Sequence, residues 1–175
     1  GLGIMYKTLD LSSKIKLVVS DFDGIFTDNS VYILNDGMRV KKVSYKDLMG
    51  VSIAVKNGIK VAIISGEQSR EIDYIAEKFV LEDIHQGIRI KCPILNDLKE
   101  KYNLSDEEIL YIGDDINDIE CLKSVKYAVT VNQANYAVKQ INGILITEAP
   151  AGDGAFREVI DNIMELKRQE ESNEA

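Results

Sequence analysis

Residues 15–24 read IKLVVSDFDG, an apolar run followed at once by two carboxylates and a glycine. A short apolar run of this kind is typical of a parallel strand that is buried on both faces. Asp21 and Asp23 stand two residues apart at its carboxyl end, so their side chains can converge on one ion or one phosphoryl group. Two carboxylates this close repel each other unless a cation lies between them, which favours a divalent metal.

The rest of the chain alternates apolar runs with amphipathic segments, which predicts an α/β, Rossmann-like parallel sheet with helices on both faces. The predicted strands are Ile15–Ser20, Lys60–Ser65, Asp83–Gln86, Ile109–Ile112, Tyr127–Val131 and Gly143–Ile146. The predicted helices are Leu48–Asn57, Ser69–Phe79, Pro93–Tyr102, Asn117–Ser124, Asn135–Ile141 and Ala155–Gln169.

One segment breaks this alternation. Two strand-like stretches flank Asn35-Asp36-Gly37, which is a hairpin turn signal, so residues 30–43 are predicted to project as a β-hairpin beside the acidic pair. The length of 175 residues fits one domain. Within it we expect an N-terminal extension over residues 1–13 and a flexible tail over residues 170–175.

The overall charge excludes some partners. The chain carries 21 basic and 29 acidic residues, a net charge of −8, which argues against binding to nucleic acid or to an anionic membrane surface. No apolar stretch approaches the ~20 residues of a membrane span, and no secretory signal pattern opens the sequence. Cys92 and Cys121 lack metal-type spacing, so free thiols and a cytoplasmic location are expected.

The acidic pair is the first of four polar elements that we expect at the carboxyl ends of strands, where open α/β sheets bind ligands. The other three elements are Ser65-Gly66, Lys91 and the run Gly113–Asp118. Together they are suited to phosphoryl transfer. Asp21 would attack phosphorus and form an aspartyl-phosphate, while Asp23 would protonate the leaving alcohol and then deprotonate the attacking water.

The same elements provide ligands for a hard cation, and Mg²⁺ is the expected ion. Asp21, the backbone carbonyl of Asp23 and Asp114 would hold the ion, since Mg²⁺ prefers oxygen ligands. Lys91 and Ser65 would neutralise the phosphate oxygens. Asp115 and Asp118 are expected around this centre, with Asp118 holding either a metal-bound water or Lys91.

The four motifs in this order resemble those of the haloacid dehalogenase superfamily of phosphatases. The absence of an insertion after Ser65 resembles the capless branch of that superfamily, and specifically the 3-deoxy-D-manno-octulosonate 8-phosphate (KDO 8-phosphate) phosphatase family. The matching segments are Asp21–Asp28, Lys46-Asp47-x-x-Gly50, Gln86-Gly87, Gly113–Asp115 and Gly152–Glu158. The resemblance implies Mg²⁺-dependent hydrolysis of a small anionic sugar-acid phosphate. It also implies a homotetramer in which hairpins pack together.

The resemblance further implies a set of substrate-binding residues. Gly66 is followed by Glu67 where the octulosonate enzymes usually have arginine. Glu67 with Lys78 is similar to the pair in relatives that act on nine-carbon acids, such as 2-keto-3-deoxynononate or sialic acid 9-phosphate. Asp47 is expected to orient the loops around the substrate. Arg157 is expected either to bind a substrate carboxylate from an adjacent subunit or to form a salt bridge at the start of its helix.

Two functions of other classes stay open at this point. Similar domains occur as non-catalytic oligomerisation modules behind cytidylyltransferases, although all four motifs are present in this chain. A phosphotransferase or mutase is the other alternative, and it usually needs a cap to exclude water.

Overall fold

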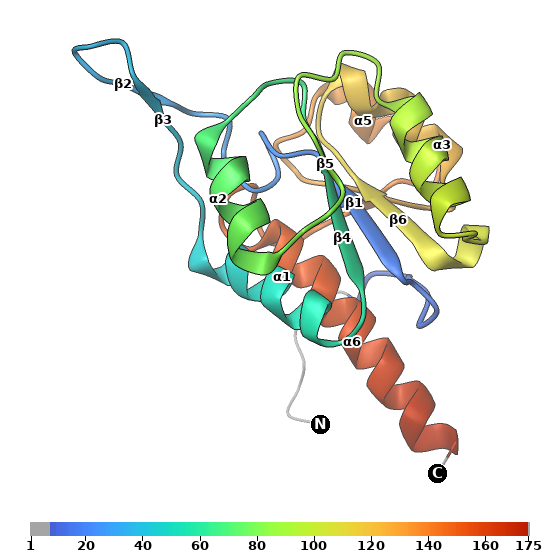
Figure 1. Cartoon of the computed structure of the whole chain (residues 1–175). Coiled ribbons are helices and arrows are strands. Elements are labelled where there is room, and N and C mark those ends of the chain that lie inside the picture. The colour runs from blue at the N-terminus through green and yellow to red at the C-terminus, as the bar shows by residue number, and fades with distance from the viewer. Residues whose placement is uncertain (1–7, 175) are drawn as a thin grey trace.

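Six parallel strands form the central sheet, in the order β5-β4-β1-β6-β7-β8 (Figure 1). The computed structural model describes residues 8–174. The strand β1 is Leu17–Ser20, the apolar run that precedes the acidic pair, and it lies between β4 and β6. The predicted α/β fold is therefore confirmed, and the acidic pair follows a central strand of the sheet.

The remaining elements follow the predicted alternation of strand and helix. The other strands of this sheet are β4 (Lys60–Ile64), β5 (Ile84–His85), β6 (Ile109–Ile112), β7 (Tyr127–Thr130) and β8 (Leu145–Ile146). The helices are α1 (Tyr45–Lys56), α2 (Arg70–Phe79), α3 (Cys92–Lys101), α4 (Ile119–Ser124), α5 (Tyr136–Lys139) and α6 (Ala155–Glu174), with 3₁₀ turns η1 (Asp106–Glu108) and η2 (Ile116–Asp118). None of the described helices is long and apolar enough to cross a membrane.

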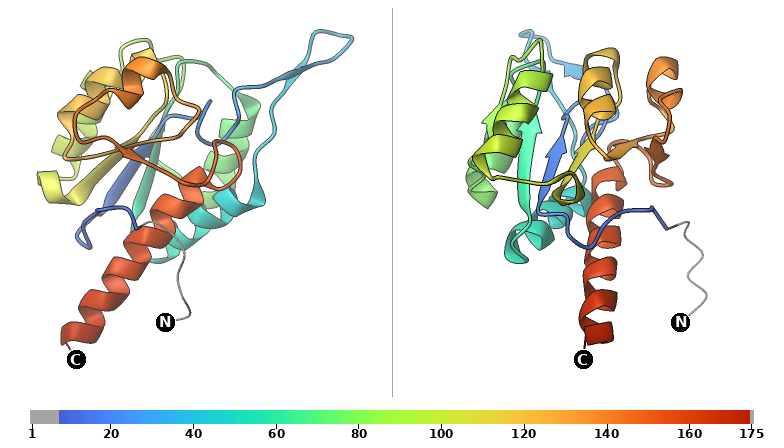
Figure 2. Two further views of the ribbon diagram at one scale, coloured as in Figure 1. Left: turned by 180° about the vertical axis from the view of Figure 1, so that it is seen from behind. Right: turned by 90° about the vertical axis from the view of Figure 1, so that its right-hand side faces the viewer.

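Helices cover both faces of the sheet, because successive strand side chains point to opposite sides. Val18 packs into one apolar cluster with α1, α2 and α6, whereas Leu17 and Val19 pack into a second cluster with α3, α4 and α5. The edge-on view in Figure 2 shows helices on either side of the sheet. A strand buried on both faces has to be apolar at every position, which is why β1 reads as a continuous run.

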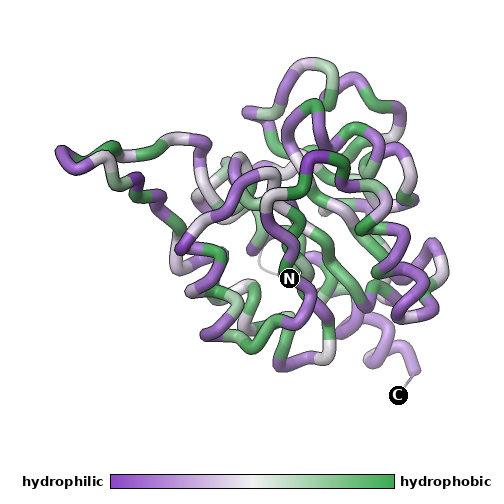
Figure 3. The backbone as a smooth tube through the Cα atoms, turned by 45° about the horizontal axis from the view of Figure 1, so that its top comes forward, coloured by the Kyte–Doolittle hydropathy of each residue, from purple (hydrophilic) through white to green (hydrophobic). Residues whose placement is uncertain are grey.

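Residues 30–43 form the predicted hairpin, with β2 (Tyr32–Ile33) pairing antiparallel to β3 (Arg39–Val40). It projects from the body of the molecule beside α2 (Figure 1). Figure 3 shows both hydrophobic and hydrophilic residues in the hairpin, whereas the strands of the central sheet are hydrophobic along most of their length. In the second arm of the hairpin, residues 38–41, apolar and basic residues alternate. Between β1 and β4 the chain contributes only this hairpin and α1, so no cap domain is inserted there.

The structure differs from the prediction mainly at helix ends. The helix α1 begins at Tyr45, three residues before the predicted start, because the side chain of Ser44 caps it by accepting the Lys46 N–H. The helix α6 continues through residues 170–174, which were predicted as a flexible tail. Within the predicted N-terminal extension, Leu9 and Leu11 are buried in the core. Residues 1–7 and 175 lie outside the described residues.

The aromatic contact between α6 and the acidic loop predicts a specific loss of stability. Phe156 is fully buried, and its ring centroid lies 4.6 Å from that of Phe26. Phe156→Ala should lower the free energy of unfolding by about 3–5 kcal/mol, because it removes a buried ring and leaves a cavity. Urea denaturation measures this value. The exposed Glu171 on the same helix provides the control, and Glu171→Ala should change it by less than about 0.5 kcal/mol.

Candidate active site

Three of the four predicted polar elements line one cleft at the carboxyl ends of β4, β1 and β6: the Asp21–Asp23 pair, the Ser65-Gly66 loop and the Asp114 loop. These three strands are neighbours, so the loops that follow them lie at the same edge of the sheet. Lys91, the fourth element, is buried against Asp21 and is not among the residues that line the cleft. The cleft has a volume of about 370 Å³. It is lined by Asp21, Asp23, Asn29, Val31, Arg39, Lys41, Ser65, Gly66, Glu67, Asp114, Asp115 and Asn117.

A buried lysine joins three of these elements. Lys91 directly precedes α3, and its ammonium lies 3.0 Å from Asp21 Oδ1 and 2.9 Å from Asp118 Oδ1. Of the two partners expected for Asp118, a metal-bound water or Lys91, the structure shows the ion pair with Lys91. The Tyr111 hydroxyl also donates to Asp118 Oδ1, and Asp118 Oδ2 accepts the backbone N–H groups of Asp114 and Asp115. Both oxygens of Asp118 are thus fully engaged within the protein.

Burial and the neighbouring charges shift the pKa values of Asp21, Asp118 and Lys91. Burial and the neighbouring Asp118 carboxylate raise the pKa of Asp21 well above its usual value, and Lys91 acts against them. Although burial opposes ionisation, Lys91 holds the pKa of Asp118 below its usual value. The two carboxylates also raise the pKa of Lys91 in spite of its burial. The lysine therefore stays charged, and it favours the ionised form of both acids.

Asp114 has the one buried side-chain oxygen or nitrogen without a hydrogen bond among residues 8–174. Its Oδ2 accepts from the Asn29 amide at 3.0 Å, while its Oδ1 has no partner. Gly24, at φ +84°, leaves the space for this carboxylate, since a Cβ there would overlap Asp114 Oδ2. Burial raises the pKa of Asp114 to about 6. A buried carboxylate oxygen that accepts no hydrogen bond is suited to bind a cation.

The donor set fits a hard divalent cation. Oxygen atoms of Asp21, Asp114 and Asp118 lie within 4.8 Å of one another. Asp118 already accepts four hydrogen bonds. The carboxylates that remain available to bind the cation are therefore those of Asp21 and Asp114. The Asp23 side chain lies outside this cluster and points toward the hairpin, so a ligand from Asp23 would have to be its backbone carbonyl, as predicted.

Lys41 is a cleft residue that the sequence analysis missed. Its ammonium lies 2.8 Å from Asp23 Oδ2, 2.8 Å from Ser69 Oγ and 3.4 Å from Glu67 Oε2. The Thr27 hydroxyl donates to the other oxygen of Asp23. Basic residues at alternating positions in the hairpin strand were the available signal, because the hairpin was already expected beside the site. Asn29, Arg39 and Asn117 were missed as well.

The predicted pairing of Glu67 with Lys78 does not form. Glu67 lines the cleft and pairs with Lys41, whereas Lys78 donates to the Tyr74 hydroxyl at 3.4 Å and lies over its ring. Lys78 stands one helical turn after Tyr74 on α2, so these two side chains are neighbours. Lys78 is not among the residues that line the cleft.

Asp47, predicted to orient the loops around the substrate, and Arg157, predicted to bind substrate or to form a salt bridge, are engaged at the junction of α1 and α6. The Asp47 carboxylate is fully buried and accepts the backbone N–H groups of Gly154 and Arg157, so it caps the start of α6. Arg157 forms an i,i+4 ion pair with Asp161, which is the salt-bridged helix start of the two alternatives. Neither residue lines the cleft.

The remaining predicted residues do line the cleft. Ser65 directly follows β4, and its hydroxyl accepts the N–H of Glu67, which folds the loop around Gly66 toward the site. Asp115 caps η2 through its own side chain, which accepts the N–H of Ile116. Its carboxylate therefore serves the loop that carries Asp114.

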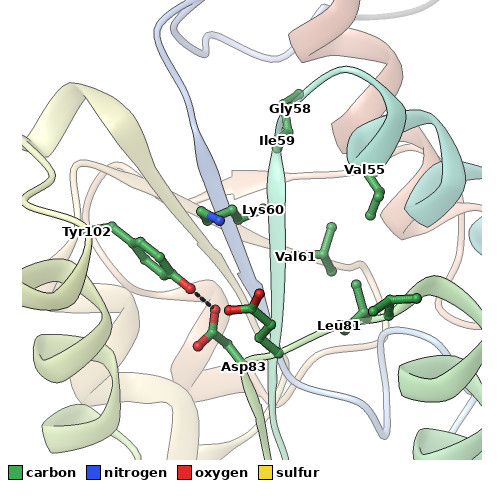
Figure 4. Close-up of a pocket in the computed structure, with 10 residues that line it drawn as sticks. Val55, Gly58, Ile59, Lys60, Val61, Leu81, Asp83 and Tyr102 are labelled. Atoms are coloured by element: carbon green, nitrogen blue, oxygen red, sulfur yellow. Dashed lines mark hydrogen bonds between the residues drawn. The ribbon is translucent and has the colours of Figure 1, made fainter.

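A second pocket, of about 170 Å³, lies at the amino end of β4 (Figure 4). Figure 4 shows the hydroxyl of Tyr102, which directly follows α3, bonded to Asp83, with the apolar side chains of Val55, Val61 and Leu81 on the other side of the pocket. Although burial opposes it, hydrogen bonds from Lys101 and Tyr102 lower the pKa of Asp83. Both carboxylate oxygens are thus satisfied, and this pocket lacks the catalytic elements found in the cleft.

Comparisons with known proteins identify the family of this chain. Residues 90–158, which include Lys91 and the Asp114 loop, match the model of the haloacid dehalogenase-like hydrolases. A protein from Legionella pneumophila assigned to subfamily III A of the HAD superfamily of hydrolases superposes with a TM-score of 0.84. It is 32% identical, and the alignment covers 91% of this chain and 87% of that one. The chain therefore belongs to the haloacid dehalogenase-like hydrolase family.

Two other relatives have a more specific description. The 3-deoxy-D-manno-octulosonate 8-phosphate phosphatase KdsC of Escherichia coli is 29% identical over 153 residues, which cover 87% of this chain and 81% of KdsC. The 3-deoxy-D-manno-octulosonate 8-phosphate phosphatase of Moraxella catarrhalis, in complex with magnesium ion, phosphate ion and a KDO molecule, superposes with a TM-score of 0.83. It is 28% identical, with 91% of this chain and 92% of that chain covered.

The free oxygen of Asp114 predicts that stabilisation by Mg²⁺ grows with pH. Because burial raises the pKa of Asp114 above its unfolded value, the metal-free protein loses this group's contribution to stability as the pH rises through about 6. A cation that binds the ionised carboxylate reverses this loss. The increase in unfolding temperature on adding Mg²⁺ should therefore be larger at pH 7.5 than at pH 5.

Thermal unfolding of the whole chain, with and without Mg²⁺, measures this difference. Asp114→Asn serves as the control, since it should remove most of the Mg²⁺ effect at pH 7.5. An equal shift at both pH values in the unaltered protein would contradict the assignment of Asp114 as a ligand.

Proposed function

We propose that this protein is a Mg²⁺-dependent phosphatase that hydrolyses the phosphate monoester of a 2-keto-3-deoxy sugar acid, of the KDO 8-phosphate type. One observation carries this proposal: the Asp21 carboxylate lies at the end of a central strand, held by Lys91, beside the unpartnered oxygen of Asp114. A nucleophile, a cation and a metal ligand thus converge on one point.

Asp21 is the proposed nucleophile. Its Oδ1 accepts the Phe22 N–H and faces Lys91, which orients the carboxylate within the cleft. Attack by a carboxylate oxygen on phosphorus would form an aspartyl-phosphate and release the sugar-acid alcohol. Water would then hydrolyse the acyl phosphate and regenerate Asp21.

Asp23 is the proposed proton carrier. It lines the same cleft two residues later, and its carboxylate is held between the Thr27 hydroxyl and the Lys41 ammonium. From this position it would protonate the leaving oxygen in the first step and accept a proton from water in the second.

The phosphate would be bound by groups of opposite charge and by hydrogen-bond donors. Lys91 and the Ser65-Gly66 loop lie at the ends of neighbouring elements and would contact the phosphoryl oxygens. Asp21, Asp114 and the backbone carbonyl of Asp23 would hold Mg²⁺. When bound, this ion neutralises negative charge that develops on the phosphoryl group.

The relatives support an eight-carbon substrate, since two of them are described as KDO 8-phosphate phosphatases and one holds KDO. The nine-carbon alternative depends on a Glu67–Lys78 pair. Because Glu67 pairs with Lys41 and Lys78 contacts Tyr74, the argument for that alternative is weakened.

We also propose a homotetramer, in which the hairpin contributes the contact. Alternation along its strands places Tyr32, Leu34, Met38 and Val40 on the face away from the cleft. All four are exposed, between 37% and 67%. An apolar strand face of this kind is typical of protein interfaces. The free Cys92 and Cys121 support a cytoplasmic location, where thiols stay reduced.

The activity is tested by hydrolysis of KDO 8-phosphate, a nine-carbon acid 9-phosphate and an aryl phosphate. We expect activity to need Mg²⁺, to be lost in excess chelator and to prefer the eight-carbon substrate. Asp21→Asn should lower kcat by about 10³-fold or more, because the amide cannot attack phosphorus.

Asp97→Asn makes the same chemical change on the exposed side of α3 and should leave kcat unaltered. Full activity of Asp21→Asn would refute the mechanism. A chain with all its motifs and no phosphatase activity would instead favour the oligomerisation module.

The tetramer is tested on the apolar hairpin face. Val40→Glu places a charge among exposed apolar side chains and should shift the protein to smaller species in analytical ultracentrifugation. Val80→Glu, at an exposed position after α2, should leave the sedimentation unchanged. An unaltered protein that sediments as a monomer would contradict the proposed assembly.

A further inference from the structure

The hairpin presents two basic side chains to the catalytic cleft. Arg39 lies on β3 and Lys41 in the segment that directly follows it, two residues later, and both line the cleft. Val31, on the opposite strand of the hairpin, lines it too. The side of the hairpin toward the acidic site therefore carries both basic residues beside the apolar Val31 and Ile33, whereas Tyr32 and Val40 lie on the other face.

The two basic residues differ in what they contact. The Lys41 side chain is only 7% exposed, and its ammonium is shared between Asp23, Ser69 and Glu67. The Arg39 guanidinium is exposed and makes no hydrogen bond or ion pair within residues 8–174. Arg39 is thus the cleft cation whose charge the protein itself leaves uncompensated.

The charges of the residues that line the cleft indicate a role for Arg39. Five of the residues that line the cleft are acidic and two are basic. Glu67 in particular would repel an anionic substrate, but Lys41 lies 3.4 Å from it and neutralises it. Because Lys41 is paired with Glu67, Arg39 is the cleft-lining cation that can attract a second negative group of the substrate, besides the phosphate.

We propose that Arg39 binds the carboxylate of the substrate and so selects sugar-acid phosphates over neutral sugar phosphates. This inference rests on the proposed phosphatase function. It concerns the carboxylate end of the substrate, which is opposite to the phosphate. A guanidinium presents two parallel N–H groups that match a carboxylate, which a lysine cannot do. Arg39 lies two residues farther out than Lys41, about 6.7 Å along an extended strand, so it meets the substrate away from the phosphate.

The test compares KDO 8-phosphate with its methyl ester, which keeps the sugar and the phosphate but lacks the negative charge of the carboxylate. The unaltered protein should have a higher kcat/KM for the acid than for the ester, by about 10- to 100-fold. In Arg39→Ala this ratio should fall to near one. Arg39→Lys should restore part of it, since the charge returns without the planar fork.

Lys42→Ala is the matched control. It removes one positive charge from the exposed residue next to Lys41, which is not among the residues that line the cleft, and should keep the ratio of the unaltered protein. Unfolding temperature checks that each variant is folded. Because Arg39 is exposed and unpaired in the described chain, its replacement removes no internal contact.

The two proposals fail in distinguishable ways. If Arg39→Ala keeps the ratio, or if the unaltered protein hydrolyses KDO 8-phosphate without preferring it to the ester, the role of Arg39 is refuted and the phosphatase function stands. If the unaltered protein hydrolyses aryl phosphate but neither the acid nor the ester, the sugar-acid function itself is refuted, and the role of Arg39 with it.

Discussion

The buried ammonium of Lys91 is the interaction on which the site depends. It lies between Asp21 and Asp118, two carboxylates that share the interior of the protein and would otherwise raise each other's pKa. One charge thereby links the end of β1, the start of α3 and the turn before α4. Asp118 in turn holds the loop of Asp114 through two backbone N–H groups. The nucleophile and the metal ligand are therefore positioned by the same network of charges.

This network leaves some atoms free and occupies others, and the chemistry follows from that division. The oxygens of Asp118 are saturated by hydrogen bonds, so Asp118 orients its neighbours. Asp114 keeps one buried oxygen without a donor, and Asp21 faces the open cleft. In the hairpin, Lys41 forms ion pairs with Asp23 and Glu67. Arg39 lines the same cleft and forms no ion pair within the described residues, so its charge is available to a ligand. In the proposed complex this hairpin supplies substrate contacts that a cap would otherwise provide, and its other face is the proposed surface for a partner subunit.

Most of the fold could be predicted from the sequence, because the relevant signals are local. Strands buried on both faces need continuous apolar runs, and the Asn35-Asp36-Gly37 turn needs residues that tolerate a positive φ. The errors of the predicted fold lie at the ends of two helices. The start of α1 depends on the Ser44 cap, and the helical state of residues 170–174 depends on the continuation of α6, neither of which an apolar pattern reports.

The sequence by itself determined which groups stand at the ends of the strands: the Asp21–Asp23 pair, the Ser65 loop, Lys91 and the Asp114 loop. Strand period and chain order are sufficient for that, since parallel strands end at one edge of a sheet. Only the tertiary structure decided the partners of the charged side chains. Glu67 pairs with Lys41 and not with Lys78, and Asp47 caps α6 instead of facing substrate. Such pairings depend on which segments lie across a cleft or a helix junction, and that distance is set by packing, not by separation along the chain.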